Sequence, residues 1–405
     1  MQQEFDVIIL GGGMVGAAVA CALGEGSLRV ALIEQALPEP FSPEQAHDMR
    51  VSALSIASRR ILEMVGAWEG VLSRRYCPFR RMKVWEDYGE TEFRSDTLEC
   101  PELGYIVENR ITQLALLERL PRFRHITLYA PTQIAELDYQ PERSRISLTD
   151  GSVLTARLLI AADGGTSRAR QAAGIGVTGW DYQQHALVLY VETAYEQQDI
   201  TWQRFVPTGP QAFLPLTGPH ASLVWYHSPD AVRRLQRLPL ATLCEELRAA
   251  FPPQLGEIKQ ILGVASFPLK RQHAQTYVKT GIALVGDAAH TINPLAGQGV
   301  NIGLLDAAAL AQVILEADAR GKDWAAIETL RTYQQMRRQD NLIMMTAMDV
   351  FYHVFSNTIG PLKFARNLGL GVAQRVMPIK RKVMRVAMGL DGHLPKLAQG
   401  RPILD

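Results

Sequence analysis

The feature that most constrains the fold is a glycine-rich turn near the N-terminus, within DVIILGGGMVGAAVA at residues 6–20. Gly11, Gly13 and Gly16 give the pattern G-x-G-x-x-G directly after a predicted strand and at the start of a predicted helix. The first glycine of this pattern permits a tight turn, the second lets a pyrophosphate approach the backbone, and the third allows close helix–strand packing. A dinucleotide-binding βαβ unit is therefore expected, with Met14 and Val15 among its binding residues.

An acidic residue follows at the end of the next predicted strand, LRVALIE. Glu34 lies 34 − 16 = 18 residues after the last glycine, where a carboxylate accepts hydrogen bonds from both hydroxyls of an adenosine ribose. A carboxylate at this place favours a dinucleotide with a free 2′-hydroxyl. The sequence therefore predicts FAD or NAD rather than NADP.

A second loop of similar layout lies far along the chain, in LVGDAAHTINPLAGQGVNIG at residues 284–303. Apolar residues lead into Gly286-Asp287, and a loop with Pro294 and two glycines precedes a new apolar stretch. A strand, a tight loop and a helix start bring backbone N–H groups to an anion. The loop begins 286 − 16 = 270 residues after the first one, which raises the question of why one chain carries two.

Composition restricts the class of protein. Of 405 residues, 47% are hydrophobic and 20% charged, and the net charge is +1, which is ordinary for a globular enzyme and gives no global field for nucleic acid. The four cysteines form no CxxC pair, so neither a zinc site nor a disulfide framework is expected. The N-terminus has no basic segment before its apolar run, and no stretch approaches the ~20 apolar residues of a membrane span. These features favour the cytoplasm.

The order of predicted elements indicates an α/β body interrupted by a sheet. Helices are predicted from Arg50 to about Val65 and over residues 105–120, and a hairpin is predicted around Asp150-Gly151. Short runs rich in β-branched and aromatic residues then predict a separate antiparallel sheet. Three domains are expected. A discontinuous nucleotide-binding domain covers residues 1–179 and 269–330, with part of the substrate cover near 70–105. An inserted sheet domain covers residues 180–268, and a C-terminal helical region covers residues 331–405.

Three ordered motifs carry a resemblance to a known family: GGGMVG at 11–16, ADGGTSRAR at 162–170 and GDAAHTINPLAGQGVN at 286–301. Together they resemble the FAD-dependent aromatic hydroxylases, the class A flavoprotein monooxygenases with the p-hydroxybenzoate hydroxylase fold. The segments RVSALSIAS, GYIVEN and DYQQHALV are most similar to the hydroxylases of ubiquinone biosynthesis. The resemblance implies a Rossmann-like FAD-binding domain with an inserted antiparallel-sheet substrate domain and C-terminal helices.

The resemblance also implies a set of FAD-binding residues. The helix beginning near residues 299–301 would aim its N-terminus at the flavin N1–C2=O edge and stabilise anionic reduced flavin, and Pro294 would line the reacting face. His290 is expected to be a structural residue, and Arg168 and Arg170 to be solvated rather than phosphate ligands. Beyond the first loop and Glu34, the implied contacts are Arg50, Arg110, Asp163, Gly164, Gly286, Asp287, Pro294, Gly297, Gly299, Val300 and Asn301.

No HExxH, GxSxG or paired-carboxylate pattern is found, so no catalytic side chain is assigned and the cofactor is expected to carry the chemistry. The resemblance implies that NAD(P)H reduces FAD, and that reduced flavin and O₂ give a C4a-hydroperoxide that hydroxylates a polyprenyl methoxy-methyl-benzoquinol (demethoxyubiquinol). The inserted sheet would cover the ring, with Phe213, Trp225 and Tyr226 as candidate substrate contacts.

Two alternatives stay open at this point. One is hydroxylation at another ring position in the same pathway, and the other is a flavin-binding component of the biosynthetic complex without turnover. Expected partners are the benzoquinol and other proteins of ubiquinone biosynthesis, with no nucleic acid. A C-terminal stretch rich in Met, Phe, Arg and Lys leaves peripheral contact with the inner membrane open. An oligomer also stays open.

Overall fold

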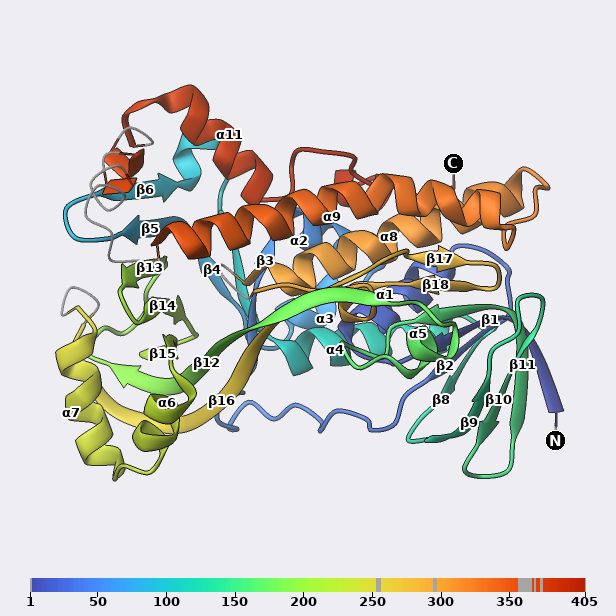
Figure 1. The fold of residues 1–405 in the computed structure, drawn as a ribbon, viewed down its shortest axis with the longest axis horizontal. Coiled ribbons are helices and arrows are strands. Elements are labelled where there is room, and N and C mark those ends of the chain that lie inside the picture. Colours follow the sequence, from blue (N-terminus) through green and yellow to red (C-terminus); the bar gives the residue numbers. More distant parts are fainter. Residues whose placement is uncertain are drawn as a thin grey trace.

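The chain folds into a parallel-sheet layer and a second, mostly antiparallel sheet, with the long helix α9 running across both (Figure 1). The structure is a computed structural model. It describes residues 2–252, 256–293, 297–355, 366–367, 369–371 and 374–404.

The first sheet contains the N-terminal βαβ unit and has the strand order β17-β18-β11-β1-β2-β8, with β10 and β9 added beside β11. Strand β1 pairs in parallel with β2 and β11, and Val7, Ile8 and Ile9 are fully buried, as expected for a strand covered on both faces. The strands are β1 (Gln2–Leu10), β2 (Val30–Ile33), β8 (Ile126–Tyr129), β9 (Ile134–Asp138), β10 (Ser144–Leu148), β11 (Val153–Ala161), β17 (Val278–Lys279) and β18 (Ile282–Leu284).

The second sheet has the order β19-β16-β12-β15-β14-β13-β5-β6 and confirms the inserted antiparallel sheet. Its two longest strands, β12 and β16, reach from the first sheet into the second (Figure 1). The strands are β5 (Arg81–Trp85), β6 (Glu90–Arg94), β12 (Val177–Thr193), β13 (Ile200–Val206), β14 (Gly209–Pro215), β15 (His220–His227), β16 (Ile258–Ala274) and β19 (His290–Thr291).

A small third sheet has the order β3-β7-β4. Its strands are β3 (Val51–Ser55), β7 (Gly104–Glu108) and β4 (Cys77–Phe79). The helices are α1 (Met14–Leu23), α2 (Ile56–Met64), α3 (Trp68–Leu72), α4 (Asn109–Leu117), α5 (Arg168–Ala172), α6 (Pro229–Gln236), α7 (Leu240–Ala250), α8 (Gln298–Ala319), α9 (Ile327–Phe355) and α11 (Met377–Ala387). Short 3₁₀ turns are η1 (Ser95–Leu98), η2 (Leu120–Arg122), η4 (Gly286–Ala288) and η6 (Lys396–Gln399).

Two predicted helices are wrong at their starts, which are strands instead. The segment after Arg50 begins as strand β3, and the helix predicted from residue 105 begins as strand β7. The two strands pair antiparallel, with Val51 opposite Glu108, so a contact between distant segments overrides the local helical pattern. Helix α2 then starts after Ser55, whose hydroxyl accepts a hydrogen bond from the Ser58 N–H at 3.2 Å.

Helix α8 also differs from the expectation that no segment approaches the length of a membrane span. It has 22 residues and is apolar enough to cross a membrane by length and composition. However, 83% of its most apolar stretch is buried inside the protein, and core helices of globular proteins pass the same test. Its alanines and glycines allow close packing: a Cβ added at Gly303 would lie 2.7 Å from Val15 of α1.

The domain boundaries predicted at residues 180 and 268 fall inside strands β12 and β16. Each of these strands continues through the junction, so the nucleotide-binding part and the inserted sheet share backbone rather than a flexible linker. The predicted cover near 70–105 contributes β5 and β6 to the edge of the second sheet, where β5 pairs in parallel with β13.

Candidate functional site

The N-terminal glycine turn contains two glycines that the fold itself requires and one that leaves space. A Cβ at Gly11, which has φ +100°, would lie 2.5 Å from the Ala162 carbonyl oxygen, and one at Gly16 would lie 1.9 Å from the Gly11 carbonyl oxygen. A Cβ at Gly13 would meet no heavy atom of the described residues within 4 Å. Helix α1 has no capping side chain and no acidic residue in its first turn. Its free N–H groups therefore face open space suited to a pyrophosphate.

Glu34 is held beside this turn, at the end of β2. Its carboxylate accepts hydrogen bonds from the N–H groups of Gly12 at 2.6 Å and Ala36 at 3.0 Å, which fixes its orientation. On the other side of the turn, Gln113 donates from Nε2 to the Gly12 carbonyl oxygen at 2.9 Å. The remaining lone pairs of the carboxylate can accept ribose hydroxyls.

Arg110 has a different environment from the one its predicted role suggests. It forms a two-point ion pair with Asp48, at 2.9 Å from Nε and 3.0 Å from Nη2. It also donates to the carbonyl oxygens of Glu39 and Pro40 at 3.1 and 3.2 Å. Arg110 thus anchors the segment 39–48, and its direct contact with cofactor stays a prediction.

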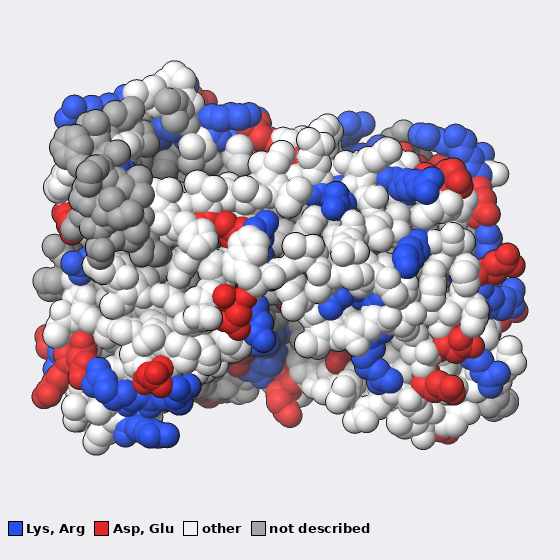
Figure 2. All heavy atoms as spheres, viewed as in Figure 1, with Lys and Arg blue, Asp and Glu red and all other residues white. Residues whose placement is uncertain are grey.

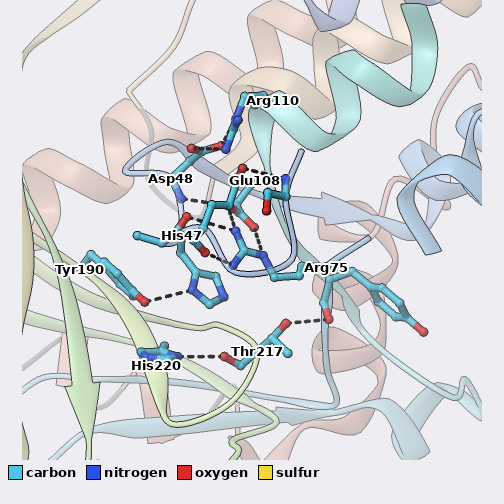
Figure 3. A network of polar contacts seen from close by, with 12 residues as sticks. His47, Asp48, Arg75, Glu108, Arg110, Tyr190, Thr217 and His220 are labelled. Carbon is cyan, nitrogen blue, oxygen red and sulfur yellow. Dashed lines mark hydrogen bonds and ion pairs between the residues drawn. The ribbon is translucent and has the colours of Figure 1, made fainter. Parts of the chain in front are cut away.

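The same segment carries a wider polar network that reaches the second sheet (Figure 3). Glu108 accepts from the Asp48 N–H at 2.8 Å and pairs with Arg75 at 2.9 Å. His47 contacts the Tyr190 hydroxyl of β12 through Nδ1 at 3.1 Å. Burial, together with the nearby Arg75 and His220, lowers the pKa of His47 to about 4. The imidazole is therefore neutral at physiological pH and joins the two parts of the molecule.

A second turn, after strand β11, lies beside the first. The Asp163 carboxylate accepts the Ala169 N–H through Oδ2 at 3.2 Å, whereas its buried Oδ1 has no hydrogen-bond partner among the described residues. Gly164 has φ +80°, and within the described part of the chain a Cβ there would meet no heavy atom closer than 4 Å. An orphaned carboxylate oxygen beside an open glycine is a fitting place for a ligand hydroxyl.

Arg170 corrects the expectation of a solvated arginine. It is 5% exposed and donates to the carbonyl oxygens of Ala288 and Gly165, each at 2.9 Å. It therefore joins the turn after β11 to the loop that contains Asp287. Arg168 is exposed and donates to the Ile134 carbonyl oxygen at 3.1 Å.

The distant loop that follows β18 meets the first turn directly. Gly286 has φ +57°, and a Cβ there would lie 3.2 Å from the Val15 side chain. Asp287 is exposed although its neighbours Gly286 and Ala288 are buried. Desolvation nevertheless raises the pKa of Asp287, while His290 and Arg50 act to lower it. Arg50 lies near enough to act on the charge of Asp287. The solvent-accessible space at Asp287, beside the sheet face whose Tyr226 contacts Asn293 of the same loop, is called the cleft below.

A buried polar network supports this loop from behind, and only His290 of its members was singled out from the sequence. Asp306 of α8 is fully buried and accepts from the Gly286 N–H at 3.3 Å and from His290 Nε2. Arg337 and Asn341 of α9 contact the same carboxylate at 3.0 and 2.9 Å. Burial would raise the pKa of Asp306, but His290, Arg337 and Asn341 lower it below its usual value. The structural role expected for His290 agrees with this contact.

Asp306, Arg337 and Asn341 were missed because they follow no local motif. Arg337 and Asn341 do interrupt a buried helical stripe at i, i+4 spacing, and that is the signal that could have found them.

Helix α8 begins beside the cleft. Its N-cap, Gly297, has φ +63°, and the half-buried first turn with Gly299 and Val300 has no capping side chain and no acidic residue. Asn301 is buried and faces inward, where its Oδ1 accepts from the Ser55 N–H at 2.9 Å and the Ser58 hydroxyl at 2.7 Å. Asn301 thus fixes the helix rather than facing the cleft.

Pro294 lies outside the described residues, so its predicted place at the reacting face stays a prediction. Its described neighbour Asn293 is buried and is considered below.

Of the three candidate substrate residues, the structure brings only Tyr226 to the cleft side of the second sheet. Its hydroxyl donates to Asn293 Oδ1 at 3.0 Å. Phe213 and Trp225 point to the opposite face, into a core with Phe251 beside helix α7. Successive strand residues alternate between the two faces of a sheet, so these two side chains lie on the face away from Tyr226, and their contact with substrate stays a prediction.

The cleft side of the sheet also has an apolar surface made of small side chains. Val224 has the same orientation as Tyr226, and in the register it lies beside Ala212 and Val188, with Ala265 opposite Val188. Ala212, Val224 and Ala265 are half-buried although their strands are interior to the sheet. Small apolar side chains that remain accessible in such a place leave room for an apolar ligand.

The residues present fit FAD. Three turns far apart in sequence are in contact, through Gly11 with Ala162 and Val15 with Gly286. They combine an uncapped helix N-terminus, a ribose-type carboxylate, an orphaned Asp163 oxygen, an accessible Asp287 and a second uncapped helix. One extended anionic dinucleotide uses all of these features, whereas two separate nucleotides would compete for adjoining loops.

Comparisons with known proteins agree with this geometry. The family described as FAD binding domain matches residues 4–346. The chain is 44% identical to 3-demethoxyubiquinol 3-hydroxylase of Escherichia coli (strain K12), over 96% of this chain and 99% of that protein. It is 38% identical to ubiquinone hydroxylase UbiL of Rhodospirillum rubrum, over 98% and 93% of the two chains. The crystal structure of p-nitrophenol 4-monooxygenase PnpA from Pseudomonas putida DLL-E4 superposes with a TM-score of 0.76 and 18% identity, over 96% and 99% of the chains.

Proposed function

The chain belongs to the FAD binding domain family and is an FAD-dependent monooxygenase, and from this premise we propose that it hydroxylates the ring of a polyprenyl methoxy-methyl-benzoquinol, a demethoxyubiquinol. The proposal is supported above all by the 44% identity, over nearly its whole length, to a 3-demethoxyubiquinol 3-hydroxylase. The overall reaction would consume NAD(P)H, O₂ and a proton, place one oxygen atom on the ring and release the other as water.

The residues of this chain would hold the cofactor at four places. The N-terminus of α1 at Gly13 would bind the pyrophosphate, Glu34 the ribose, and Asp163 and Asp287 the hydroxyls nearer the flavin. The first turn of α8 would face the flavin ring, where its positive end favours negative charge. When bound, FAD would supply the oxygen-transfer chemistry, with NAD(P)H as the reductant.

We infer that the two parts of the molecule have the separate roles that the sequence predicts. Residues 1–179 and 269–330 would hold FAD, and residues 180–268 would cover the ring of the quinol. The apolar surface around Val224 and Ala212 would take the ring and the start of the prenyl tail, with Tyr226 at its edge. Such a surface also excludes water, which limits loss of the activated oxygen as peroxide.

Another ring position in the same pathway is the alternative. This alternative is supported by the 38% identity to a ubiquinone hydroxylase of different name. That relative and the 3-demethoxyubiquinol 3-hydroxylase both match almost the whole chain. No contact among the described residues distinguishes the ring carbons.

The proposed location is the cytoplasm with peripheral contact on the inner membrane, where a polyprenyl substrate resides. Helix α11 supports membrane contact because its exposed side chains combine Arg381 and Lys382 with Val383 and Val386. On the face in Figure 2, basic and acidic residues are interspersed around a wide uncharged area, which matches the net charge of +1. Other proteins of ubiquinone biosynthesis and a second copy of the chain are the remaining proposed partners.

The proposal is tested by giving purified protein with FAD a short-tail demethoxyubiquinol, NAD(P)H and O₂. The expected product is heavier by one oxygen, and its NMR spectrum identifies the hydroxylated carbon. Incorporation of ¹⁸O from labelled O₂ rather than from water checks the source. Hydroxylation at another carbon would favour the alternative, and formation of peroxide alone would contradict both.

A further inference from the structure

Helix α9 has an unusual buried stripe. In a helix that packs on a core, the buried positions are normally apolar. In α9 the buried stripe includes Arg337, Asn341 and Asp349 beside Met345 and Tyr352. Buried charges are retained only where partners satisfy them, so their partners indicate what the helix holds.

The first part of the stripe contacts the buried Asp306, which lies behind the loop with Gly286 and Asp287. This loop is called the flavin-side loop below. Arg337 and Asn341 bind Asp306, which in turn accepts the Gly286 N–H. One turn earlier, the Tyr333 hydroxyl donates to the Leu284 carbonyl oxygen at 2.7 Å. This end of α9 therefore fixes the strand end and the loop that carry Asp287.

The later part of the stripe contacts the cleft side of the second sheet. Asp349 accepts from the Tyr182 hydroxyl and pairs with Arg271, whose guanidinium also lies 4.3 Å from the Trp180 ring centroid. Tyr352 donates to Gln184 at 2.6 Å.

The partners of Asp349 and Tyr352 lie at an irregularity in β12. The register with β16 shifts between Asp181 and His185, and Gln183 has φ +54°. Bulges of this kind redirect side chains and are frequent near active sites. Here the bulge turns Tyr182 and Gln184 toward α9.

The two ends are joined by continuous helix. Arg337 and Asp349 are 349 − 337 = 12 residues apart, which corresponds to ~18 Å of helix. Between them, Met345 is fully buried against Ile292 and Ile302, the first of which lies in the loop and the second in α8. Figure 1 shows α9 extending from the first sheet to the second.

We propose that α9 sets the spacing between the flavin-side loop and the sheet that covers the reacting ring, and that Asp349 is the positioning residue at the sheet end. Asp349 holds the bulge of β12, and Tyr226 of the neighbouring strand β15 contacts Asn293 from the same sheet. The inference rests on the proposed FAD site but not on the identity of the quinol. Loss of Asp349 would loosen the cover while the flavin-side loop keeps its own contacts.

The test compares Asp349→Asn and Tyr182→Phe at the sheet end with Arg337→Met at the loop end. Glu328→Gln is the matched control, because Glu328 is an exposed carboxylate on the same helix. Two quantities are measured on protein loaded with FAD: the dissociation constant of FAD, and the quenching of flavin fluorescence by iodide, which reports solvent access to the ring. A third is the share of NAD(P)H that ends as hydrogen peroxide with a short-tail demethoxyubiquinol.

For Asp349→Asn we expect an FAD dissociation constant within about twofold of the wild type, iodide quenching raised at least about twofold and the peroxide share raised at least about threefold, because water enters the cleft. Tyr182→Phe should change quenching in the same direction, and Arg337→Met should weaken FAD binding by about tenfold or more through the loop. Glu328→Gln should match the wild type.

Wild-type quenching in both Asp349→Asn and Tyr182→Phe would overturn the inference, as would an Asp349→Asn protein that loses FAD as strongly as Arg337→Met. If Asp349→Asn does not fold, Tyr182→Phe decides the matter, because it removes only one hydroxyl contact. If the wild type converts no quinol, the proposed substrate fails, but iodide quenching still decides the role of α9.

Discussion

Among single residues, different glycines of the N-terminal turn serve folding and cofactor binding. Gly13 has φ −65° and ψ 179°, a conformation open to any residue, and a Cβ there would meet no described residue within 4 Å. We expect Gly13→Ala to leave the melting temperature of the apoprotein unchanged and to weaken FAD binding by about tenfold or more, because the methyl group would occupy the place of the pyrophosphate. Isothermal titration and thermal denaturation measure the two effects.

Gly16→Ala is the matched variant. Its Cβ would lie 1.9 Å from the Gly11 carbonyl oxygen, so helix and strand must separate at a cost of about 1–3 kcal/mol or more. A lower melting temperature of the apoprotein is expected. If Gly13→Ala lowered it as much, or left FAD affinity intact, the separation of roles would be wrong.

The neutral His47 predicts an acid-sensitive contact at the junction of the two sheets. Its pKa is lowered from 6.5 to about 4, so below pH 6.5 the unfolded chain binds more protons than the folded one, and stability falls as pH decreases toward 4. After allowance for solvent exposure, the contribution is about 1–2 kcal/mol. In urea denaturation at pH 7 and pH 5, His47→Gln should lose less stability between the two pH values than the wild type. An equal loss would show that His47 does not titrate in this way.

At the scale of elements, one side chain fixes the start of α8. Asn301 accepts from Ser55 and Ser58 and donates to the carbonyl oxygens of Ala53 at 2.9 Å and Gly297 at 3.2 Å. Asn301→Ala should lower stability by about 2–4 kcal/mol, because buried partners lose their hydrogen bonds. It should also weaken FAD binding, since the first turn of α8 is no longer held. Denaturation curves and FAD titration test this.

Ser58→Ala is the control for that prediction, because it removes one of the four contacts and leaves the donors of Asn301 in place. It should cost less stability and retain FAD. If the two variants had equal effects, the hydrogen bonds of Ser58 in α2 rather than those of Asn301 at the start of α8 would account for the loss of stability.

At the scale of the whole molecule, the C-terminal region belongs to the core as well as to the surface. Leu397, Ala398 and Ile403 are buried in the main core, and Lys396 pairs with Glu316 of α8 at 3.0 Å. Deleting everything after about residue 360 would therefore damage the fold, so it is a poor test of membrane contact. Substitutions on the exposed side of α11 avoid this damage.

We expect Arg381→Glu combined with Val383→Ser to reduce co-sedimentation with anionic liposomes severalfold, since each basic residue near such a surface contributes about 1 kcal/mol. FAD content and melting temperature should stay at wild-type values because both side chains are exposed. Arg331→Glu, at an exposed site near the start of α9, is the control for charge alone. Co-sedimentation equal to the wild type would rule out α11 as the docking surface.

Much of the molecule could be predicted from the sequence because the signals are local. Helix α1 starts at Met14, within the glycine pattern as expected, and the hairpin of β10 and β11 turns at Asp150-Gly151 as expected. The glycine pattern, the acidic residue after β2 and the three ordered motifs likewise indicated FAD and the fold. Each of these signals depends on backbone conformation and spacing within a short stretch.

The tertiary structure decided the rest, because it depended on pairing between distant segments. Strand β3 formed where a helix was predicted, since β7 pairs with it, and Phe213 and Trp225 turned away from the cleft because sheet register sets the face. Arg170 gained its role from the distant Ala288 carbonyl oxygen, and Asp306 and Arg337 gained theirs by pairing with each other. The cofactor could thus be predicted from short motifs, whereas the buried charges that hold the loops around it became evident only from contacts between distant segments.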